Sequence, residues 1–279
     1  MIFMNFKHKL LTLLGLFALI LAACTTTGDN GTTDEAADSG PIKIGVVGED
    51  NDVWEHVQDK LAQDGITIEI VTFSDYNQPN KALAEKEIDL NSFQHKIYLD
   101  NYNEEHGTDI VPLADTFIAP LGIYSEKITD ISEIKDGDKV SIPNDVTNGG
   151  RALLLLQTAG LIEVDPAAGH TPTLDDITDN PHNLEITELD ASQTARSLSD
   201  VTIALINSGM AVDAGYIPTE DAIFLEPVDE SSDPYVNIIA ANNGDNRDVF
   251  QKIIDAFQTD DVVELNEEIS KGSSIAVWD

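Results

Sequence analysis

The sequence predicts an α/β protein with two lobes, and three observations lead to this prediction. Short β-rich runs alternate with segments whose apolar residues recur at helical spacing. The alternation occurs twice, once before Lys135 and once after it. A helical pattern over residues 248–269 then closes the chain, and we expect it to pack back on the first lobe. The length agrees, because 279 residues that are 42 % hydrophobic can form one large or two modest domains.

The first alternation begins with the β-rich run IKIGVV at residues 42–47. Residues 51–63 then place Val53, Trp54, Val57 and Leu61 at near-helical spacing. The elements expected next are a strand over 66–73, a helix over 79–87, a strand over 89–93, a helix over 94–105 and a strand-rich stretch over 110–125. This β-α-β order predicts a parallel sheet covered by helices.

The second alternation begins with the strand KVSIP at 139–143 and a helix over 148–159 that ends at Gly160. The elements expected next are a strand over 184–189, a short helix over 191–198, a strand over 201–206, a turn or helix over 209–215 and a strand over 235–240. We expect two crossings between the lobes, near 118–124 and 233–237. Lobe 1 would then be 42–120 with 237–279, and lobe 2 would be 121–236. Ligands favour such inter-domain clefts.

Residues 1–23 have the layout of a secretory signal peptide. Lys7 and Lys9 precede an apolar run of about a dozen residues, which is short for a spanning helix of about 20 residues. Leu-Ala-Ala-Cys at 21–24 resembles the bacterial lipobox, which implies cleavage before Cys24 and a lipid on its thiol. The protein would then be anchored at the extracytoplasmic face of the cell membrane. An ordinary signal peptide with an accidental cysteine is the alternative. The small polar residues of 24–41 predict a flexible tether.

The charge balance excludes one class of partner. The chain has 51 acidic and 15 basic residues, a formal net charge of −36. Such a surface repels phosphate backbones, so we expect no nucleic-acid partner. Solubility explains the charge. A calcium-loaded surface is the sharper alternative, but no EF-hand pattern occurs in the sequence.

Several catalytic signatures are absent from the sequence. Gly45-Val46-Val47-Gly48 lacks the third glycine of the dinucleotide motif, and no Walker lysine, Gly-x-Ser-x-Gly elbow or His-Glu-x-x-His occurs. None of the six histidines is paired at helical spacing. We therefore expect a binding protein with no metal and no cofactor, not an enzyme. Two alternatives stay open: an exported hydrolase that uses His95 with a nearby carboxylate, and a surface adhesin that uses its acidic face.

Residues 144–151, NDVTNGGR, join a strand to a helix. Two glycines at a helix N-terminus would free backbone N–H groups, which favour an anion. Arg151 is expected in the first turn, where the helix dipole disfavours a cation. A cation at this position is better explained if it holds a carboxylate, and the planar guanidinium of arginine suits such a bidentate contact. A solvated or structurally paired arginine is the alternative.

Two further groups of residues have the character of a site. Phe93, His95 and Tyr98 follow a strand and, with Tyr76, would wall a pocket suited to a soft apolar group such as a thioether. Aromatic core packing is the alternative. Asn207 ends a strand and Asn237 lies between β-branched residues, so each amide needs a partner. A bound ammonium would supply one, and neighbouring backbone is the alternative.

At these segments the sequence resembles the methionine-binding lipoproteins of bacterial ABC importers, the NlpA/MetQ family. The matching stretches are YNQPN at 76–80, DLNSFQH at 89–95, SIPND at 141–145, TNGGRAL at 147–153 and Ile206-Asn207. Spread in order, they cover nearly all of the folded body. The resemblance implies a two-lobe fold of the type II periplasmic-binding-protein kind that closes on an amino acid. It also implies a membrane permease driven by an ATPase as partners.

The resemblance assigns roles to the candidate residues. Arg151 would hold the α-carboxylate, Asn207 and Asn237 chiefly the ammonium, and Tyr76, Phe93, His95 and Tyr98 the thioether, with Asn148 as a further ligand contact. Methionine of either hand, or a dipeptide that contains it, is the implied ligand. Two stretches depart from the family pattern: Ser208-Gly209-Met210 follows Asn207 in place of an Asn-Tyr-like pair, and QTAR at 193–196 replaces Gln-Leu-Pro-Arg. They bear on ligand identity more than on the fold.

Overall fold

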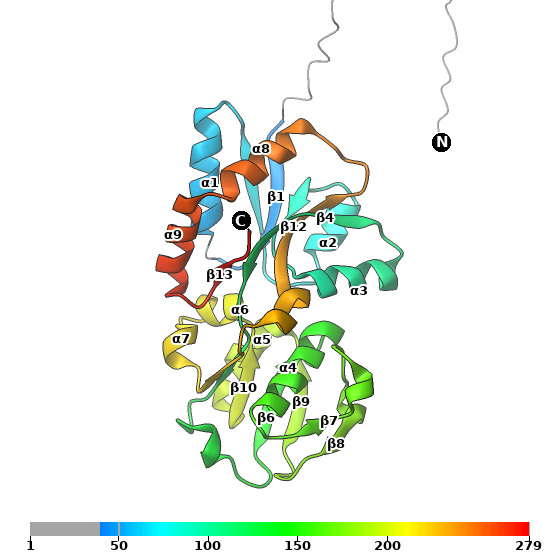
Figure 1. The fold of residues 1–279 in the computed structure, drawn as a ribbon, viewed down its shortest axis with the longest axis vertical. Coiled ribbons are helices and arrows are strands. Elements are labelled where there is room, and N and C mark those ends of the chain that lie inside the picture. The colour runs from blue at the N-terminus through cyan, green and yellow to red at the C-terminus, as the bar shows by residue number, and fades with distance from the viewer. Residues whose placement is uncertain (1–39, 50, 279) are drawn as a thin grey trace, which may run out of the picture. The chain divides into compact units, whose positions relative to one another are not determined.

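The computed structural model describes residues 40–49 and 51–278. The predicted signal peptide, Cys24 and nearly all of the predicted tether lie outside the described residues. Within the described part, none of the helices is long and apolar enough to cross a membrane. Two sheets, each covered by helices, dominate this part of the chain (Figure 1).

The first sheet has six strands in the order β13-β4-β12-β3-β1-β2. Its strands are β1 (Ile42–Val47), β2 (Ile68–Phe73), β3 (Leu90–Asn91), β4 (Ile110–Ile118), β12 (Val236–Asn242) and β13 (Ile275–Ala276). Strand β1 runs parallel to β2 and β3, whereas β12 runs antiparallel to β3 and β4. The sheet is therefore mixed, and the prediction of a parallel sheet was wrong in this respect. The reason is that the chain leaves this sheet along β4 and returns beside it along β12.

Helices cover both faces of the first sheet. Those on one side are α1 (Asp52–Gln63), α8 (Asp248–Phe257) and α9 (Asp260–Ser270), and those on the other are α2 (Pro79–Ala84) and α3 (Lys96–His106) (Figure 1). Trp54 of α1 packs against Phe257 of α8, with ring centroids 4.8 Å apart. The expected return of the C-terminal helix to the first lobe is confirmed by this packing.

The C-terminal segment is not the single helix expected over 248–269. Helix α8 ends at Phe257, and Thr259 takes an extended backbone conformation before α9 begins. Asp260 and Asp261 in the first turn of α9 are favoured by its helix dipole. Strand β13 then pairs with β4 and was not predicted.

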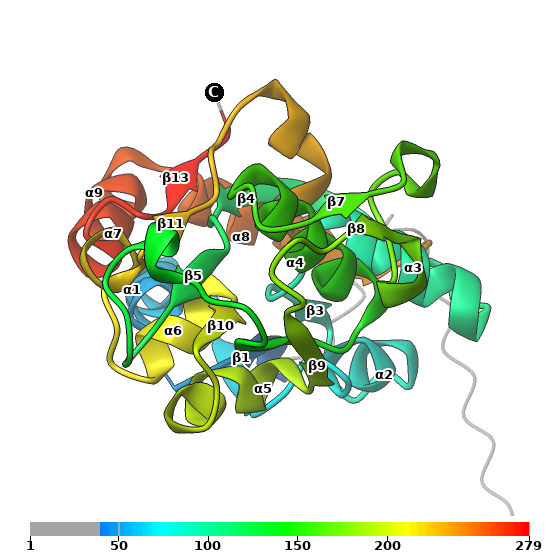
Figure 2. The same cartoon turned by 90° about the horizontal axis from the view of Figure 1, so that it is seen from below.

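The second sheet has five strands in the order β11-β5-β10-β6-β9. Its strands are β5 (Gly122–Tyr124), β6 (Lys139–Pro143), β9 (Glu185–Leu189), β10 (Ile203–Ile206) and β11 (Phe224–Leu225). Strand β6 runs parallel to β9 and β10, and β5 runs antiparallel to β10. One hydrophobic cluster joins this sheet to α4 (Val146–Thr158), and another joins it to α6 (Ser208–Asp213). Figure 2 shows both helices beside the strands of this sheet.

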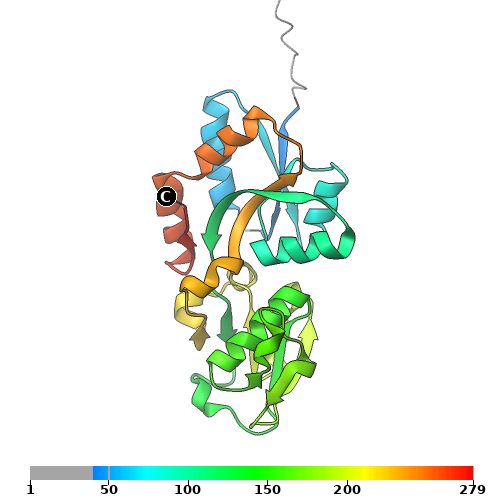
Figure 3. The same cartoon turned by 45° about the vertical axis from the view of Figure 1, so that its right-hand side comes forward.

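Shorter elements complete the second half. They are α5 (Ala191–Thr194), α7 (Pro218–Asp221), the antiparallel pair β7 (Glu163–Val164) and β8 (Ile177–Asp179), and 3₁₀ helices at Ile131–Glu133, Pro166–Ala168, Leu174–Asp176, Ala195–Ser199 and Glu230–Tyr235. The chain passes from β4 to β5 and returns from the last 3₁₀ helix into β12, close to the two expected crossings (Figure 3).

Candidate functional site

A cavity lies between the strands and helices of the two sheets. Its lining includes all eight residues singled out in the sequence: Tyr76, Phe93, His95, Tyr98, Asn148, Arg151, Asn207 and Asn237. Its water-accessible volume is about 120 Å³. Val47 ends β1, Phe93 follows β3 and Asn207 follows β10, so the cavity lies at the carboxyl ends of these strands.

The lobe-1 side of the cavity is an aromatic wall of Tyr76, Phe93 and Tyr98. The ring centroid of Phe93 lies 6.0 Å from that of Tyr76 and 5.8 Å from that of Tyr98. The Tyr98 hydroxyl donates a hydrogen bond to the Tyr76 carbonyl oxygen at 3.0 Å. Burial raises the pKa of Tyr76 and of Tyr98, so both phenols stay neutral. The wall is therefore uncharged, and its rings pack against one another.

His95 joins this wall to lobe 2. It caps helix α3, because Nδ1 accepts a hydrogen bond from the backbone N–H of Tyr98 at 3.2 Å. Nε2 then carries the proton and donates to Oδ1 of Asn148 at 3.2 Å. Burial, followed by the positive charge of Arg151, lowers the pKa of His95 to about 3. The hydrolase alternative required a carboxylate beside this ring, but its hydrogen-bond partners are a backbone amide and a carboxamide.

Next to the aromatic wall, three buried amides satisfy one another, and one of them, Gln94, also lines the cavity. Asn80 and Gln94 exchange two hydrogen bonds of 2.6 and 2.7 Å. Asn91 donates to Asn80 at 2.8 Å and accepts from Gln94 at 3.0 Å. These bonds tie α2 to β3 and to the loop that carries Phe93 and His95. The backbone of that loop also meets β12, where His95 forms an isolated β-bridge with Asn237.

The lobe-2 side of the cavity is polar. Asn148 of α4 donates through Nδ2 to both oxygens of Asp145, at 3.0 and 3.1 Å. Its Oδ1 accepts from Nδ2 of Asn207 at 2.7 Å as well as from His95. Oδ1 of Asn207 is buried and has no hydrogen-bond partner among the described residues. A buried acceptor in that condition is destabilising by about 1–3 kcal/mol, so this wall would gain from a donor in the cavity.

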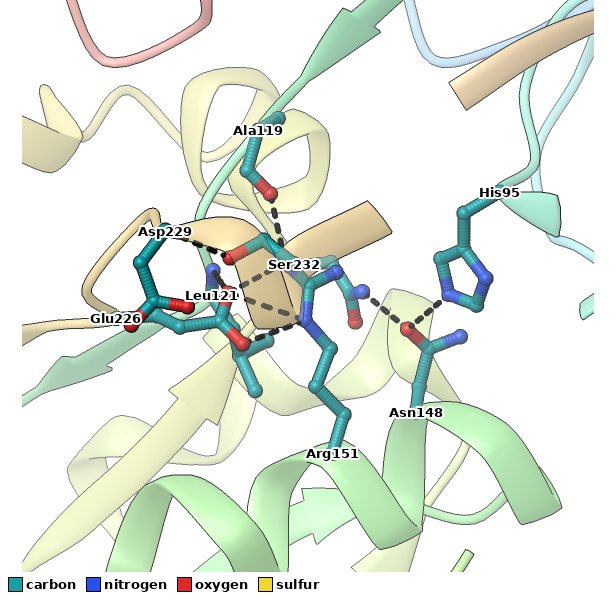
Figure 4. Close-up of polar contacts among 9 residues, drawn as sticks. His95, Ala119, Leu121, Asn148, Arg151, Glu226, Asp229 and Ser232 are labelled. Atoms are coloured by element: carbon teal, nitrogen blue, oxygen red, sulfur yellow. Dashed lines mark hydrogen bonds and ion pairs between the residues drawn. The ribbon is translucent and has the colours of Figure 1, made fainter. Parts of the chain in front are cut away.

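Arg151 is buried and forms an ion pair with Glu226, a partner that was not predicted. Nε donates to Glu226 at 3.0 and 3.1 Å, and Nη2 donates to Glu226 and to the carbonyl oxygen of Ala119 (Figure 4). None of these bonds involves Nη1. The guanidinium carbon also lies 4.4 Å from the centre of the Tyr235 ring. The structurally paired alternative therefore holds for one edge of this side chain, while Arg151 still lines the cavity.

Two expectations about the segment 144–151 were wrong. Helix α4 begins at Val146, because Asp145 caps the N–H of Asn148, so Arg151 lies beyond the first turn. The two glycines also leave no anion site of the kind expected, since the N–H of Gly149 donates to the Asp145 carbonyl oxygen at 2.8 Å. They permit close packing instead: a Cβ at Gly149 would lie 2.9 Å from the Pro143 carbonyl oxygen, and one at Gly150 2.7 Å from Cα of Thr171.

Sequence reasoning missed Glu226, Asp145 and the amide cluster. Asp145 had a usable signal, because an aspartate three residues before Asn148 is a typical helix N-cap. No local signal in the sequence marked Glu226, since it lies 75 residues from Arg151 along the chain.

Comparison with known proteins identifies the family. The model of the NlpA lipoprotein family matches residues 42–278. The chain belongs to the NlpA lipoprotein family. This confirms the resemblance seen in the sequence.

Two relatives of this chain are both named as lipoproteins. The chain is 41 % identical to the D-methionine-binding lipoprotein MetQ of Escherichia coli strain K12, over 99 % of this chain and all of the relative. It is 39 % identical to outer membrane lipoprotein 3 of Mannheimia haemolytica, over 97 % of this chain and 98 % of the relative.

Solved structures agree with the fold. The substrate-binding protein of a methionine transporter from Streptococcus pneumoniae has a TM-score of 0.81 at 43 % identity, over 85 % of this chain and 96 % of that one. A nutrient-binding protein from Burkholderia cenocepacia, solved with methionine, has a TM-score of 0.81 at 42 % identity, over 85 % of this chain and all of that one. The predicted two-lobe fold of the periplasmic-binding-protein kind is confirmed by these matches to solute-binding proteins.

Proposed function

We propose that this protein is the substrate-binding lipoprotein of an ABC importer and captures methionine for uptake. A lipid on Cys24 would anchor it at the extracytoplasmic face of the membrane. It would deliver its ligand to a permease driven by an ATPase. The observation that carries the proposal is the cavity between the two sheets. It has an aromatic wall on one side, and on the other a polar wall with a buried acceptor that has no partner among the residues that the structure describes.

The proposed binding mode assigns one part of methionine to each wall. The α-carboxylate would meet Nη1 of Arg151, the edge that Glu226 does not occupy. The ammonium would donate to Oδ1 of Asn207, with Asn237 beside it. The thioether would rest against Tyr76, Phe93, His95 and Tyr98, at about 0.3–1.5 kcal/mol for each sulfur–aromatic contact. A ligand held by both lobes stabilises the closed arrangement by its differential affinity for that arrangement.

A second hollow adjoins the first and bears on ligand size. It has a water-accessible volume of about 250 Å³ and shares Val47, Phe93 and Asn237 with the first cavity. A methionine-containing dipeptide could extend into it, so this ligand belongs in the test beside both hands of methionine. Trp54 also lines the second hollow and offers a fluorescence signal.

Native mass spectrometry of freshly purified protein tests the proposal directly, because a tight ligand co-purifies. We expect a mass increment equal to that of methionine, and calorimetry should show L-methionine, D-methionine or the dipeptide binding with a Kd below about 1 μM. The ligand should be recovered unchanged after prolonged incubation, which separates capture from hydrolysis. Absence of calorimetric binding for all three ligands contradicts the proposal and favours the adhesin alternative.

A further inference from the structure

The carboxylate of Asp145 accepts hydrogen bonds from two residues of its own segment, Thr147 and Asn148. Its donors are Oγ1 of Thr147 at 3.0 Å, the backbone N–H of Asn148 at 2.9 Å, and Nδ2 of Asn148 at 3.0 and 3.1 Å. Burial raises the pKa of Asp145, and its hydrogen bonds with Asn148 and Thr147 oppose that rise. In its carboxylate form, Asp145 can only accept hydrogen bonds. The carboxamide of Asn148 must therefore turn its nitrogen toward Asp145 and its oxygen toward the cavity.

This orientation is passed on to Asn207. With its oxygen turned away from Asp145, Asn148 accepts from Nδ2 of Asn207 at 2.7 Å and from Nε2 of His95 at 3.2 Å. Because the NH₂ group of Asn207 donates to Asn148, the Asn207 oxygen must point the other way. That oxygen is the buried acceptor without a partner among the described residues, and Asn207 is only 8 % exposed.

We infer that Asp145 is a positioning residue that makes the lobe-2 wall of the cavity selective for a ligand carrying a primary ammonium group. The inference rests on the proposed function and deepens it, because it names a residue that, together with His95, fixes the amide orientation through which Asn207 selects the ammonium. Asp145 acts through Asn148 and Asn207, so three hydrogen bonds in sequence separate it from the ligand. If the Asn148 amide were free to turn, Asn207 could turn with it and present its NH₂ group, which repels an ammonium.

The side chain of Asp145 also caps helix α4, so a test must separate capping from orientation. Asp145→Asn does this, because asparagine caps a helix as well as aspartate does. With its oxygen kept for the cap, its NH₂ group replaces the second oxygen, which accepts from Nδ2 of Asn148 at 3.1 Å, so the Asn148 amide loses one of the two acceptors that orient it. Asp165→Asn is the matched control. Asp165 is an exposed cap of the 3₁₀ helix Pro166–Ala168, accepts from the N–H of Ala167 at 2.9 Å, and does not line the cavity.

The first measurement is calorimetric affinity for methionine and for 4-(methylthio)butanoic acid, which is methionine without its amino group. We expect Asp145→Asn to weaken methionine binding at least tenfold and binding of the analogue less than twofold. The preference for the amine should therefore shrink, while Asp165→Asn changes neither affinity. An equal loss for both ligands, or no loss for either, overturns the inference.

The second measurement needs no ligand. Asp145, Asn148 and Asn207 all belong to the second half of the fold, so their hydrogen bonds do not depend on closure of the lobes. In the NMR spectrum of the ligand-free protein, the side-chain NH₂ of Asn207 should exchange slowly, and this protection should disappear in Asp145→Asn alone. If the wild type binds neither ligand, the proposed function fails and this measurement still decides the inference. Unchanged protection of Asn207 in Asp145→Asn overturns it.

Discussion

The two walls of the cavity treat their polar groups in opposite ways. On the lobe-1 side, the amides of Asn80, Asn91 and Gln94 satisfy one another, and the Tyr98 hydroxyl is spent on the Tyr76 backbone. On the lobe-2 side, the Asn207 oxygen is buried with no partner in the described part of the chain. The first wall therefore offers surface and the second offers hydrogen-bonding capacity. We infer that the aromatic wall recognises the shape of a ligand and the lobe-2 wall its charge.

The largest expected effect comes from breaking the ion pair on the lobe-2 side. Arg151→Ala should weaken methionine binding at least about thirtyfold, because it removes the cation proposed to hold the carboxylate. It should also lower the free energy of unfolding by about 3–5 kcal/mol, since Glu226 is left without its partner. Calorimetry and urea unfolding measure the two effects separately.

A double variant separates binding from structure at this position. Arg151→Met/Glu226→Gln removes both charges while roughly conserving volume, so most of the lost stability should return. Binding should stay weak, because the ligand carboxylate still lacks its cation. A double variant that regained wild-type affinity would show that Arg151 serves the fold alone.

The contrast between the walls was partly visible in the sequence. The aromatic residues follow a predicted strand within a few positions of one another. Their short spacing along the chain was therefore enough to group Phe93, His95 and Tyr98. Asn207 was also recognisable, because an amide at a strand end requires a partner. Arg151 was singled out by its expected place in the first turn of a helix, which was wrong, although it does line the cavity. All eight candidates line the same cavity.

Features set by distant contacts were not predictable. The partner of Arg151 is contributed by a segment after β11, and nothing local to Glu226 marks it. The antiparallel direction of β12 follows from the two crossings between the sheets, not from its own residues. Strands of two residues, such as β7 and β11, are too short to show an alternating pattern. The break at Thr259 is masked by apolar spacing that continues through it.

His95 gives a prediction of intermediate size on the boundary between the walls. In the unfolded chain, His95 takes up a proton below its ordinary pKa of 6.5. In the folded protein, its pKa is about 3, so it stays neutral until the pH approaches that value. The free energy of unfolding should therefore fall as the pH falls through this window, at up to about 1.4 kcal/mol per pH unit. Between pH 7 and 5 the wild type should lose about 2 kcal/mol more than His95→Asn, measured by urea unfolding at each pH.

His95→Asn is a suitable reference because asparagine can still cap α3 and does not titrate. The acidic residues titrate equally in both proteins, so the difference between the two curves isolates the imidazole. Parallel curves between pH 7 and 5 would mean that His95 is protonated as easily in the folded protein as in the unfolded chain. The neutral bridge to Asn148 would then be wrong.

The smallest expected effect comes from the aromatic wall itself. Phe93→Leu removes one ring beside Tyr76 and Tyr98 while keeping an apolar side chain. Losing a sulfur–aromatic contact of about 0.3–1.5 kcal/mol should weaken methionine binding by roughly two- to tenfold. Norleucine has a methylene in place of the sulfur, so its binding affinity should fall less. The preference for ligands with an amino group should not change, because Asn207 lies on the other wall. If calorimetry shows an equal loss of affinity for methionine and norleucine, the wall responds to side-chain volume alone. If the preference for ligands with an amino group falls as well, shape and charge are not recognised by separate walls.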